Sequence, residues 1–370
     1  MEEGTQAAAL PDDLVVEILA RLPARSLCRF RCVSRSWRRL ISDPAHRARF
    51  AQTLSGLFRV RHYRSLPGWS FAAGLSTPPP PPPPGVDTAL SFLPAGCGET
   101  TLVHTCNGLL LLRRRSPPQP PFYVVCNPAT GEWITLPQPS HAPGQYDCFN
   151  DELMGDISTC NAALGFDPAV SSHFHVFQLV QKVVCFDYDV VAVEIFSSET
   201  GSWVLKENGW DEHKFDRECT LTSLGPLTFF NGFLHFCIHG DAVASVDTKG
   251  QTWRLSIVQH REIYGYGFLG HSQGHLQYAD LGNHLERDTV SIYVLEDDDS
   301  WEWTFKHNIT MLDLFQPGMS DWFIAAFHPH GNLIFFYDSS QERLMSYDLN
   351  RRDVHVICTL EEEFNEYRSF

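Results

Sequence analysis

At 370 residues with 43% apolar composition, the chain is long enough for one small and one large globular domain. Residues 1–115 hold 15 Lys and Arg against 8 Asp and Glu, a charge of +7; since the total is −16, the remainder carries −23. An acidic field of this size disfavours nucleic acid and anionic membranes as partners of the C-terminal part.

The eleven cysteines show neither a paired framework nor a close C-x-x-C spacing, which argues against a secreted disulfide scaffold and a zinc ribbon. Cys28 and Cys32 are four residues apart without a matching His or Cys pair, so we interpret both as helix-packing residues. No leader-like segment and no run of roughly 18 apolar residues is present in the sequence. This predicts a soluble protein of the cytoplasm or nucleus.

The first predicted element is a helix in residues 12–22. Its apolar residues recur at one-, three- and four-residue steps, and it is entered through Pro11 and an acidic pair and stopped by Pro23. A second periodic run, residues 27–41, follows with Ser34 as an expected internal N-cap. A unit of about 40 residues buries too little surface to be stable alone, so we expect much of its apolar face to pack against another protein.

These residues resemble the F-box, the module by which substrate receptors dock on the Skp adaptor of cullin-RING ubiquitin ligases. Leu10-Pro11-Asp12 with Leu14 is similar to the opening motif, and Val33, Trp37 and Leu40-Ile41 with Asp43-Pro44 to the closing one. The chain departs from the family where Ser34 and Ser36 replace the frequent Cys and Lys. The resemblance implies an F-box over residues 5–50 whose adaptor-binding residues are Leu10, Pro11, Leu14, Ile18, Leu19, Leu22, Pro23, Leu27, Val33, Trp37, Leu40 and Ile41.

A basic helix-turn-helix that reads DNA is the alternative for this segment, because clustered cations are a footprint for phosphate. The arginines concerned are Arg21, Arg25, Arg29, Arg31, Arg35, Arg38 and Arg39. The Leu-Pro pairs on both sides of the first helix and the large apolar stripe favour protein docking.

Residues 51–100 are expected to be a transition segment with a polyproline stretch at residues 77–85. Its seven consecutive prolines predict an extended rod of roughly 20 Å, at about 3.1 Å per residue. We interpret it as a stiff spacer, with a ligand for an SH3- or WW-type domain as the alternative. Residues 57–61 and 89–93 on either side alternate like strands.

From Cys106 onward the chain repeats a turn followed by a tryptophan. The copies end at Trp133, Trp203, Trp253 and Trp303, which are 70, 50 and 50 residues apart, and a weaker fifth copy at residues 348–354 lacks the aromatic. This is the period of a kelch-like propeller blade. We interpret the tryptophans as residues that pack between blades, with ligand stacking as the alternative.

Each period also contains an earlier pair of β-rich runs, so four strands make one blade. The fold class predicted is a small all-α F-box followed by an all-β propeller of five to six four-stranded blades, over residues 101–362. The strands predicted at residues 57–61 and 90–93 are candidates to complete a sixth blade or to pair with the C-terminal strand around residues 354–359.

Residues 106–112 and 125–133, followed by Leu136-Pro137, resemble the start of the F-box-associated domain of plant F-box proteins. Together with the F-box, this resemblance covers nearly the whole chain.

The propeller region contains no convincing catalytic or metal-binding constellation. Asp297, Asp298 and Asp299 fall at a hairpin tip, where solvated residues belong. His271, His275 and His284 are near one another in sequence, but a four-residue step along a strand spans about 13 Å, too far for one metal. We expect no enzyme activity, no metal and no cofactor.

Loops that differ in length between repeats are the candidates for binding a target. They are residues 141–160, 208–224 and 311–322, and they mix aromatic with acidic groups. The candidate target-binding residues are Tyr146, Phe149, Asp151, Glu152, Trp210 and Asp211. The alternative is that these are merely solvated loops.

The function expected is the substrate-recognition subunit of a Skp–cullin–F-box ubiquitin ligase, with the F-box on the Skp adaptor and the propeller on a protein target. A ligase-independent protein- or nucleic-acid-binding regulator is the alternative, and a propeller enzyme or glycan-binding lectin is a third class. We expect no membrane partner.

Overall fold

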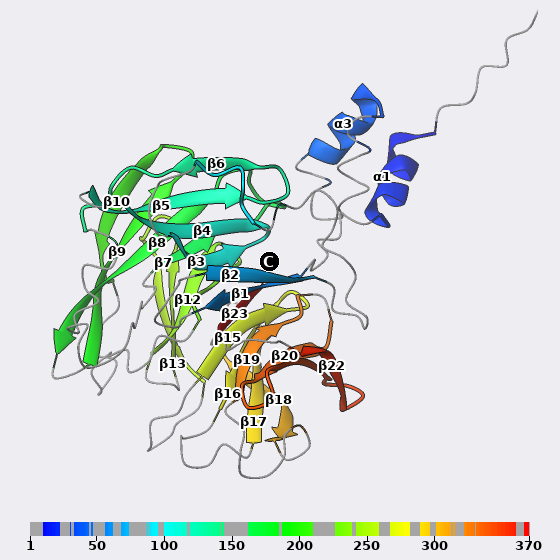
Figure 1. Cartoon of the computed structure of the whole chain (residues 1–370), viewed down its shortest axis with the longest axis vertical. Helices are drawn as coiled ribbons and strands as arrows, with labels where there is room; N and C mark the ends of the chain where they lie inside the picture. Colours follow the sequence, from blue (N-terminus) through cyan, green and yellow to red (C-terminus); the bar gives the residue numbers. More distant parts are fainter. Residues whose placement is uncertain are drawn as a thin grey trace, which may run out of the picture. The chain divides into compact units, whose positions relative to one another are not determined.

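The computed structural model describes residues 10–22, 30, 33–43, 46, 56–61, 68–73, 87, 89–94, 100–116, 119–141, 143, 162–184, 187–209, 226–238, 242–258, 267–281, 289–296, 301–311, 314, 322–329, 331–359 and 366–369. The chain divides into two compact units, residues 1–53 with 167–173, and residues 54–166 with 174–370. The first is helical and the second is built of β-strands (Figure 1).

The helical unit contains α1 (Asp12–Ala20) and α3 (Arg35–Ser42). Pro11 precedes α1, and its carbonyl accepts from the amides of Leu14 and Val15. The hydroxyl of Ser34 accepts from the Trp37 amide at 3.1 Å, which confirms the predicted N-cap of α3. Both helices end before the prolines that the sequence marks as stops.

The two helices share a small core. Val15, Val16, Leu19 and Leu40 are buried in it, and Leu22, Phe30, Trp37 and Ile41 pack around them. The rings of Phe30 and Trp37 meet edge to face, with their centroids 5.2 Å apart. At one end the Arg39 guanidinium pairs with the Asp12 carboxylate at 3.2 Å and ties α3 to α1.

The described strands form five four-stranded antiparallel blades. Blade 1 is β3 (Thr100–Cys106), β4 (Leu109–Ser116), β5 (Gln119–Asn127) and β6 (Glu132–Thr135). Blade 2 is β7 (Ala162–Gly165), β8 (His175–Val184), β9 (Asp187–Ser197) and β10 (Ser202–Glu207). Blade 3 is β11 (Thr228–Phe230), β12 (Phe233–Ile238), β13 (Ala242–Asp247) and β14 (Trp253–Ile257). Blade 4 is β15 (Gly267–Ser272), β16 (His275–Asp280), β17 (Thr289–Leu295) and β18 (Trp303–Thr310). Blade 5 is β19 (Trp322–Phe327), β20 (Leu333–Asp338), β21 (Arg343–Asp348) and β22 (Asp353–Thr359).

A three-stranded sheet, here called the closing sheet, joins two distant parts of the chain. It has the order β2 (Gly68–Ala73), β1 (Gly56–Arg61) and β23 (Glu366–Ser369). The innermost strands contact one another in the order β3, β7, β11, β15, β19 and β23, and β23 contacts β3. In Figure 1 the closing sheet lies between β3 and the strands β15 and β19. The predicted propeller is therefore confirmed, with five four-stranded blades and a ring that the closing sheet completes.

Two expectations for the ring closure need correction. The strand predicted at residues 57–61 exists as β1, but its C-terminal partner is β23, whereas the strand around residues 354–359 is β22 and pairs with β21. Residues 89–93 are not a strand. They form turns, because the Asp87 carboxylate accepts from the amides of Ala89 and Ser91, at 3.1 and 2.7 Å, and Leu90 has a positive φ of 53°.

The apolar side chains of this turn segment are used for packing. Leu90, Phe92 and Leu93 cover one face of blade 1, against Leu102, Leu110, Leu112, Val124 and Cys126. The alternation of apolar and polar residues at positions 89–93, which resembles a strand, therefore results from a turn that packs against a sheet.

The turn-plus-tryptophan repeat marks one position in every blade. Each copy lies between the third and fourth strands of its blade, and in blades 1 to 4 the tryptophan stands at the start of the fourth strand. Trp203, Trp253 and Trp303 each pack in a cluster that combines residues of their own blade and of the preceding one. This confirms their predicted role in blade packing.

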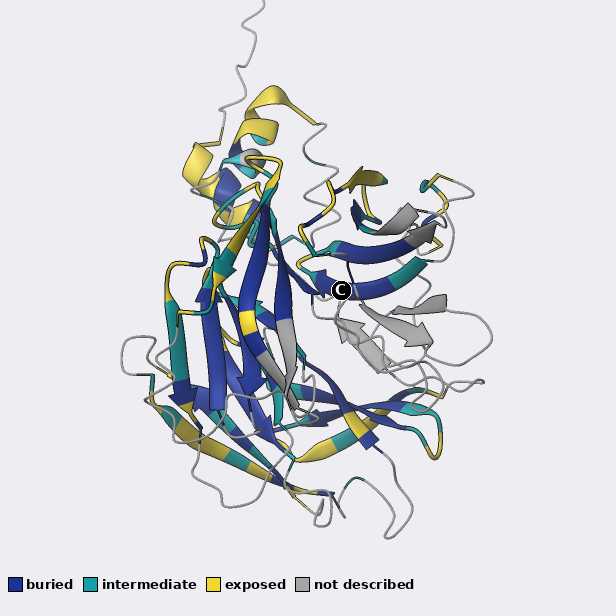
Figure 2. Ribbon diagram, turned by 90° about the vertical axis from the view of Figure 1, so that its left-hand side faces the viewer, coloured by how far each residue is buried: buried dark blue, intermediate teal, exposed yellow. Residues whose placement is uncertain are grey.

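Burial follows strand position within a blade. The second and third strands are largely buried, whereas the fourth strands are mostly exposed (Figure 2). Among the tryptophans whose burial the structure describes, Trp133 is the exposed one, with 44% of its surface accessible.

Candidate binding surfaces

The helical unit presents aliphatic side chains to solvent. Leu10, Leu14, Ile18 and Val33 are 56, 51, 46 and 61% exposed, and Pro11 is exposed beside them. Leu14 and Ile18 are one helical turn apart on α1, so they share a face. Burying half of a large aliphatic side chain in an interface is worth about 1 kcal/mol, and several of them together make a docking surface.

The residues predicted to bind the adaptor divide into two groups. Leu19 and Leu40 are buried in the helical core, and Leu22, Trp37 and Ile41 are half-buried against it. Pro23 and Leu27 lie outside the described residues. The structure therefore brings Leu10, Pro11, Leu14, Ile18 and Val33 to the surface and uses the others, where described, to hold that surface in shape.

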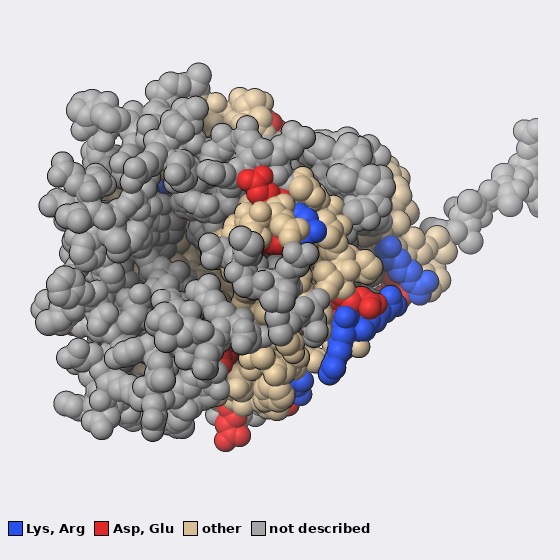
Figure 3. Space-filling model, turned by 60° about the horizontal axis from the view of Figure 1, so that its bottom comes forward, with Lys and Arg blue, Asp and Glu red and all other residues tan. Residues whose placement is uncertain are grey.

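Charged side chains accompany the exposed aliphatic residues. Arg39 pairs with Asp12, and Arg21 lies 3.8 Å from Glu17 one turn earlier on α1. Arg35 and Arg38 are exposed, whereas Arg25, Arg29 and Arg31 lie outside the described part of the chain. On the face shown in Figure 3, basic and acidic residues lie next to one another in small groups. Two of the arginines that suggested phosphate binding are therefore compensated by neighbouring carboxylates.

The six residues predicted to bind the target, Tyr146, Phe149, Asp151, Glu152, Trp210 and Asp211, lie outside the described residues. The structure does show how the first of their loops begins. The amides of Ser140 and His141 donate to the two carboxylate oxygens of Glu194, at 2.7 and 3.1 Å. Glu194 is fully buried on β9, so a carboxylate in the interior anchors the start of the loop predicted at residues 141–160.

Glu194 belongs to a polar network that crosses from blade 2 to blade 1. The side-chain amide of Gln178 donates to Glu194 at 3.0 Å and to the His141 carbonyl at 3.0 Å. The Tyr123 hydroxyl in turn donates to Gln178 at 2.9 Å. This network is not among the features predicted from the sequence, although a lone carboxylate within the apolar strand VVAVEIF is a signal that marks it.

The histidines considered as metal ligands have other contacts. His271 stacks on Phe230 with ring centroids 5.4 Å apart, and His275 is exposed at the start of the next strand. His284 lies outside the described residues. Within the described ranges, no group of three His, Cys, Asp or Glu side chains converges on a common point.

Two family models match the chain. Residues 8–48 match the F-box domain, and residues 90–369 match the family described as F-box protein At3g26010-like, beta-propeller. Among the described helices, none is long and apolar enough to cross a membrane.

Relatives from Arabidopsis thaliana match over most of their length. Putative F-box protein At1g47730 is 24% identical over 366 residues, which cover 92% of this chain and 82% of the relative. F-box protein At3g26010 is 23% identical over 375 residues, covering 96% of this chain and 81% of the relative. Among solved structures, a chain of a nidogen/laminin complex matches with a TM-score of 0.40 and 10% identity, covering 85% of this chain and 97% of that one.

Proposed function

Because the chain belongs to the At3g26010-like family of F-box proteins with a β-propeller, we propose that it is the substrate-recognition subunit of a Skp–cullin–F-box ubiquitin ligase. The helical unit would dock on the Skp adaptor, and the propeller would hold the target protein. The observation that carries the proposal is the exposure of four aliphatic side chains of the helical unit, Leu10, Leu14, Ile18 and Val33, of which Leu14 and Ile18 share a face of α1.

The proposal gives these exposed residues a physical role. Water-exposed leucine and isoleucine side chains on a small helical unit contribute little to its own folding but much to an interface that buries them. The core behind them is small, so a partner that covers the face also adds to the stability of the helices.

The chain's contribution to ubiquitin transfer would be proximity. A propeller that holds a target and a helical unit that docks on the ligase convert an intermolecular encounter into an effectively intramolecular one. In this proposal the catalytic groups belong to the partners, and the chain itself is a non-catalytic receptor.

Adaptor docking is tested by co-purification of a Skp-type adaptor with the full chain. Leu14→Ala combined with Ile18→Ala is expected to weaken binding by at least tenfold, since each substitution removes about 1 kcal/mol of interface burial. The thermal unfolding of the propeller should not change. Val204→Ala, which truncates a 47% exposed aliphatic residue on β10, is the matched control and should bind like the wild type.

Leu19→Ala distinguishes an interface effect from a folding effect. Leu19 is fully buried, so its truncation should destabilise the helical unit itself. If the double variant at Leu14 and Ile18 binds the adaptor as tightly as the wild type, the docking proposal is wrong. A salt-dependent shift of DNA by the chain without adaptor binding would instead support the nucleic-acid alternative.

A further inference from the structure

Three of the hairpins that join the third and fourth strands of a blade have the same backbone geometry. The Gly131 amide donates to the Asn127 carbonyl at 2.9 Å, the Gly201 amide to the Ser197 carbonyl at 2.8 Å, and the Arg352 amide to the Asp348 carbonyl at 2.7 Å. All three donor residues have a positive φ, of 74°, 68° and 58°. Blade 5 thus has an arginine at the position where blades 1 and 2 have glycine.

A left-handed backbone favours glycine, because the Cβ of any other L-residue crowds the neighbouring carbonyl. The strain at Arg352 is held by local hydrogen bonds: Asp348 Oδ1 accepts from the amides of Asn350 and Arg351, at 2.8 and 3.0 Å. Backbone strain that the surrounding structure holds in place is frequent at functional sites. The surroundings of the Arg352 side chain are therefore of interest.

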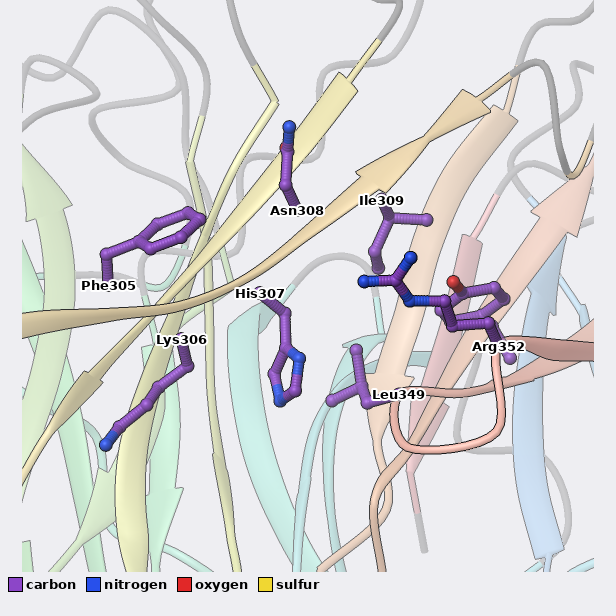
Figure 4. Close-up of a pocket in the computed structure, with 8 residues that line it drawn as sticks. Phe305, Lys306, His307, Asn308, Ile309, Leu349 and Arg352 are labelled. Atoms are coloured by element: carbon purple, nitrogen blue, oxygen red, sulfur yellow. The ribbon is translucent and has the colours of Figure 1, made fainter.

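The side chain of Arg352 lines a pocket of about 220 Å³. The other lining residues come from β18 and from the end of β21: Phe305, Lys306, His307, Asn308, Ile309, Tyr347 and Leu349. In Figure 4 the Arg352 guanidinium extends toward β18, and the His307 ring points toward Leu349, whereas Lys306 and Phe305 point away. The pocket therefore joins blade 4 to the hairpin of blade 5.

A β-bulge sets the direction of His307. Along β18, His307 pairs with Ile292 and Phe305 pairs with Tyr293, so Lys306 is the extra residue. Bulges turn the strand and redirect the side chains beside them, which here separates His307 from Lys306.

The pocket has a cationic end and an apolar wall. No carboxylate is among its lining residues, and Lys306 already pairs with Glu296. Within the described part of the chain, Arg352 forms no ion pair, and the Asp348 carboxylate is used by backbone amides of the hairpin. Ile309, Leu349 and the Tyr347 ring supply the apolar surface.

His307 adds a neutral hydrogen-bonding group beside the arginine. Partial burial lowers the pKa of His307 below its ordinary value, and the charges of Arg352 and Lys306 lower it further. A neutral imidazole offers one N–H donor. An anion placed between His307 and Arg352 would favour the protonated ring, and it would then face two cationic donors.

We propose that this pocket binds a carboxylate or phosphate group on a side chain of the target protein. An oxyanion accepts hydrogen bonds from the guanidinium of Arg352 and from the His307 ring, while the apolar wall contacts the aliphatic stem that carries it. The identification of the carrier as a target protein rests on the proposed function; the anion specificity rests on the pocket alone.

The proposal is tested by titrating the full chain with three small probes: N-acetylphosphoserine amide, N-acetylglutamate amide and N-acetylserine amide. The first two are expected to bind and to shift the NMR signals of the His307 ring, and the neutral third probe is not. The two anionic probes distinguish phosphate from carboxylate as the preferred group. Binding of N-acetylglutamate amide, whose carboxylate stays ionised above about pH 5, should strengthen as the pH falls toward the His307 pKa, because binding favours the protonated ring.

Arg352→Gly is the decisive variant, since it restores the residue found in the sister hairpins and should fold at least as well as the wild type. Binding of the anionic probes is expected to weaken about tenfold or more, as for the loss of a charge-assisted hydrogen bond. Arg351→Gln removes a neighbouring charge outside the pocket lining and should bind normally. His307→Gln should abolish the pH dependence measured with N-acetylglutamate amide.

Unchanged binding in Arg352→Gly, or equal binding of the neutral probe, would overturn the proposed anion site. Adaptor docking is measured on the same samples and separates the two proposals. If the wild type does not dock on the adaptor but still shows anion binding that depends on Arg352, only the proposed function is contradicted.

Discussion

The indole N–H of Trp303 donates to the hydroxyl of Ser256 across the boundary between blades 4 and 3, at 3.0 Å. Trp203 makes an equivalent bond at the boundary between blades 2 and 1, to the Pro137 carbonyl at 2.7 Å. In both cases the tryptophan of one blade reaches the fourth strand of the preceding blade, or the residues just after it. At these two boundaries the tryptophan of the repeat thus joins the blades by one directional bond as well as by apolar packing.

Trp303→Phe is expected to destabilise the propeller by about 1–3 kcal/mol, because it removes a hydrogen bond and part of a ring that is partly buried against blade 3. Trp133→Phe should cost much less, since Trp133 is nearly half exposed. Urea unfolding of both variants measures the difference. If both variants lose the same free energy of unfolding, the position in the repeat determines the stability, and not the contact that each tryptophan makes.

Glu194→Gln should destabilise the boundary of blades 1 and 2 by about 2–3 kcal/mol. The carboxylate accepts from the amides of Ser140 and His141 and from Gln178, whereas a glutamine would direct its own NH₂ group toward one of these donors. Thermal unfolding and amide exchange at Ser140 and His141 measure the effect. Glu199→Gln, on an exposed turn, is the control and should be nearly neutral.

The buried ring of His235 should make the folded protein less stable in mild acid. Burial lowers its pKa from 6.5 to about 4, and its ring nitrogens lie 2.7 Å from the Ser245 hydroxyl and 3.1 Å from the Phe230 carbonyl. In the unfolded chain His235 takes up a proton below about pH 6.5, but the folded protein resists this until about pH 4. The free energy of unfolding should therefore fall by roughly 3 kcal/mol in this window.

The contribution of His235 is isolated by comparing the wild type with His235→Gln. The variant is expected to be less stable near neutral pH but to lose less stability between pH 6.5 and 4. If both proteins lose stability in parallel, other groups are responsible for the acid sensitivity.

Removal of residues 366–370 should destabilise the whole ring rather than one end of it. These residues contain β23, which pairs with β1 and contacts β3 and β19. Without it the closing sheet loses its innermost strand and leaves an unpaired edge. A lower unfolding temperature and aggregation at high protein concentration are expected, and a variant lacking only Phe370 serves as the control.

Replacing a hairpin glycine by alanine and replacing Arg352 by glycine should change the free energy of unfolding in opposite directions. Gly201→Ala should cost about 1 kcal/mol through its positive φ alone, since nothing lies within 4 Å of the added Cβ. Arg352→Gly should gain up to about 1 kcal/mol by relieving the same strain. Chemical denaturation of both variants tests this; a clear loss of stability in Arg352→Gly would mean that its side chain is mainly structural.

Local features of the sequence were sufficient to predict most of the fold. The apolar periodicity of residues 14–22 and the Ser34 cap predicted the helices, and the turn-plus-tryptophan repeat predicted the blades and the packing of Trp303. Such patterns depend on hydrogen bonds and side-chain spacings within a few residues, which the sequence states directly.

Contacts between distant residues were decided only by the tertiary structure. The apolar stripe of α1 is too wide for one face, so packing against Leu40 buried Leu19 and left Leu14 and Ile18 exposed. The alternation at residues 89–93 fits a strand or a packed turn equally well, and the choice followed from the hydrogen bonds of Asp87. The pairing of β1 with β23 joins the two ends of the propeller and needs the ring to close, whereas the pocket of Arg352 needs blades 4 and 5 to pack side by side. Both contacts depend on how whole sheets are arranged and not on the residues beside them in the chain.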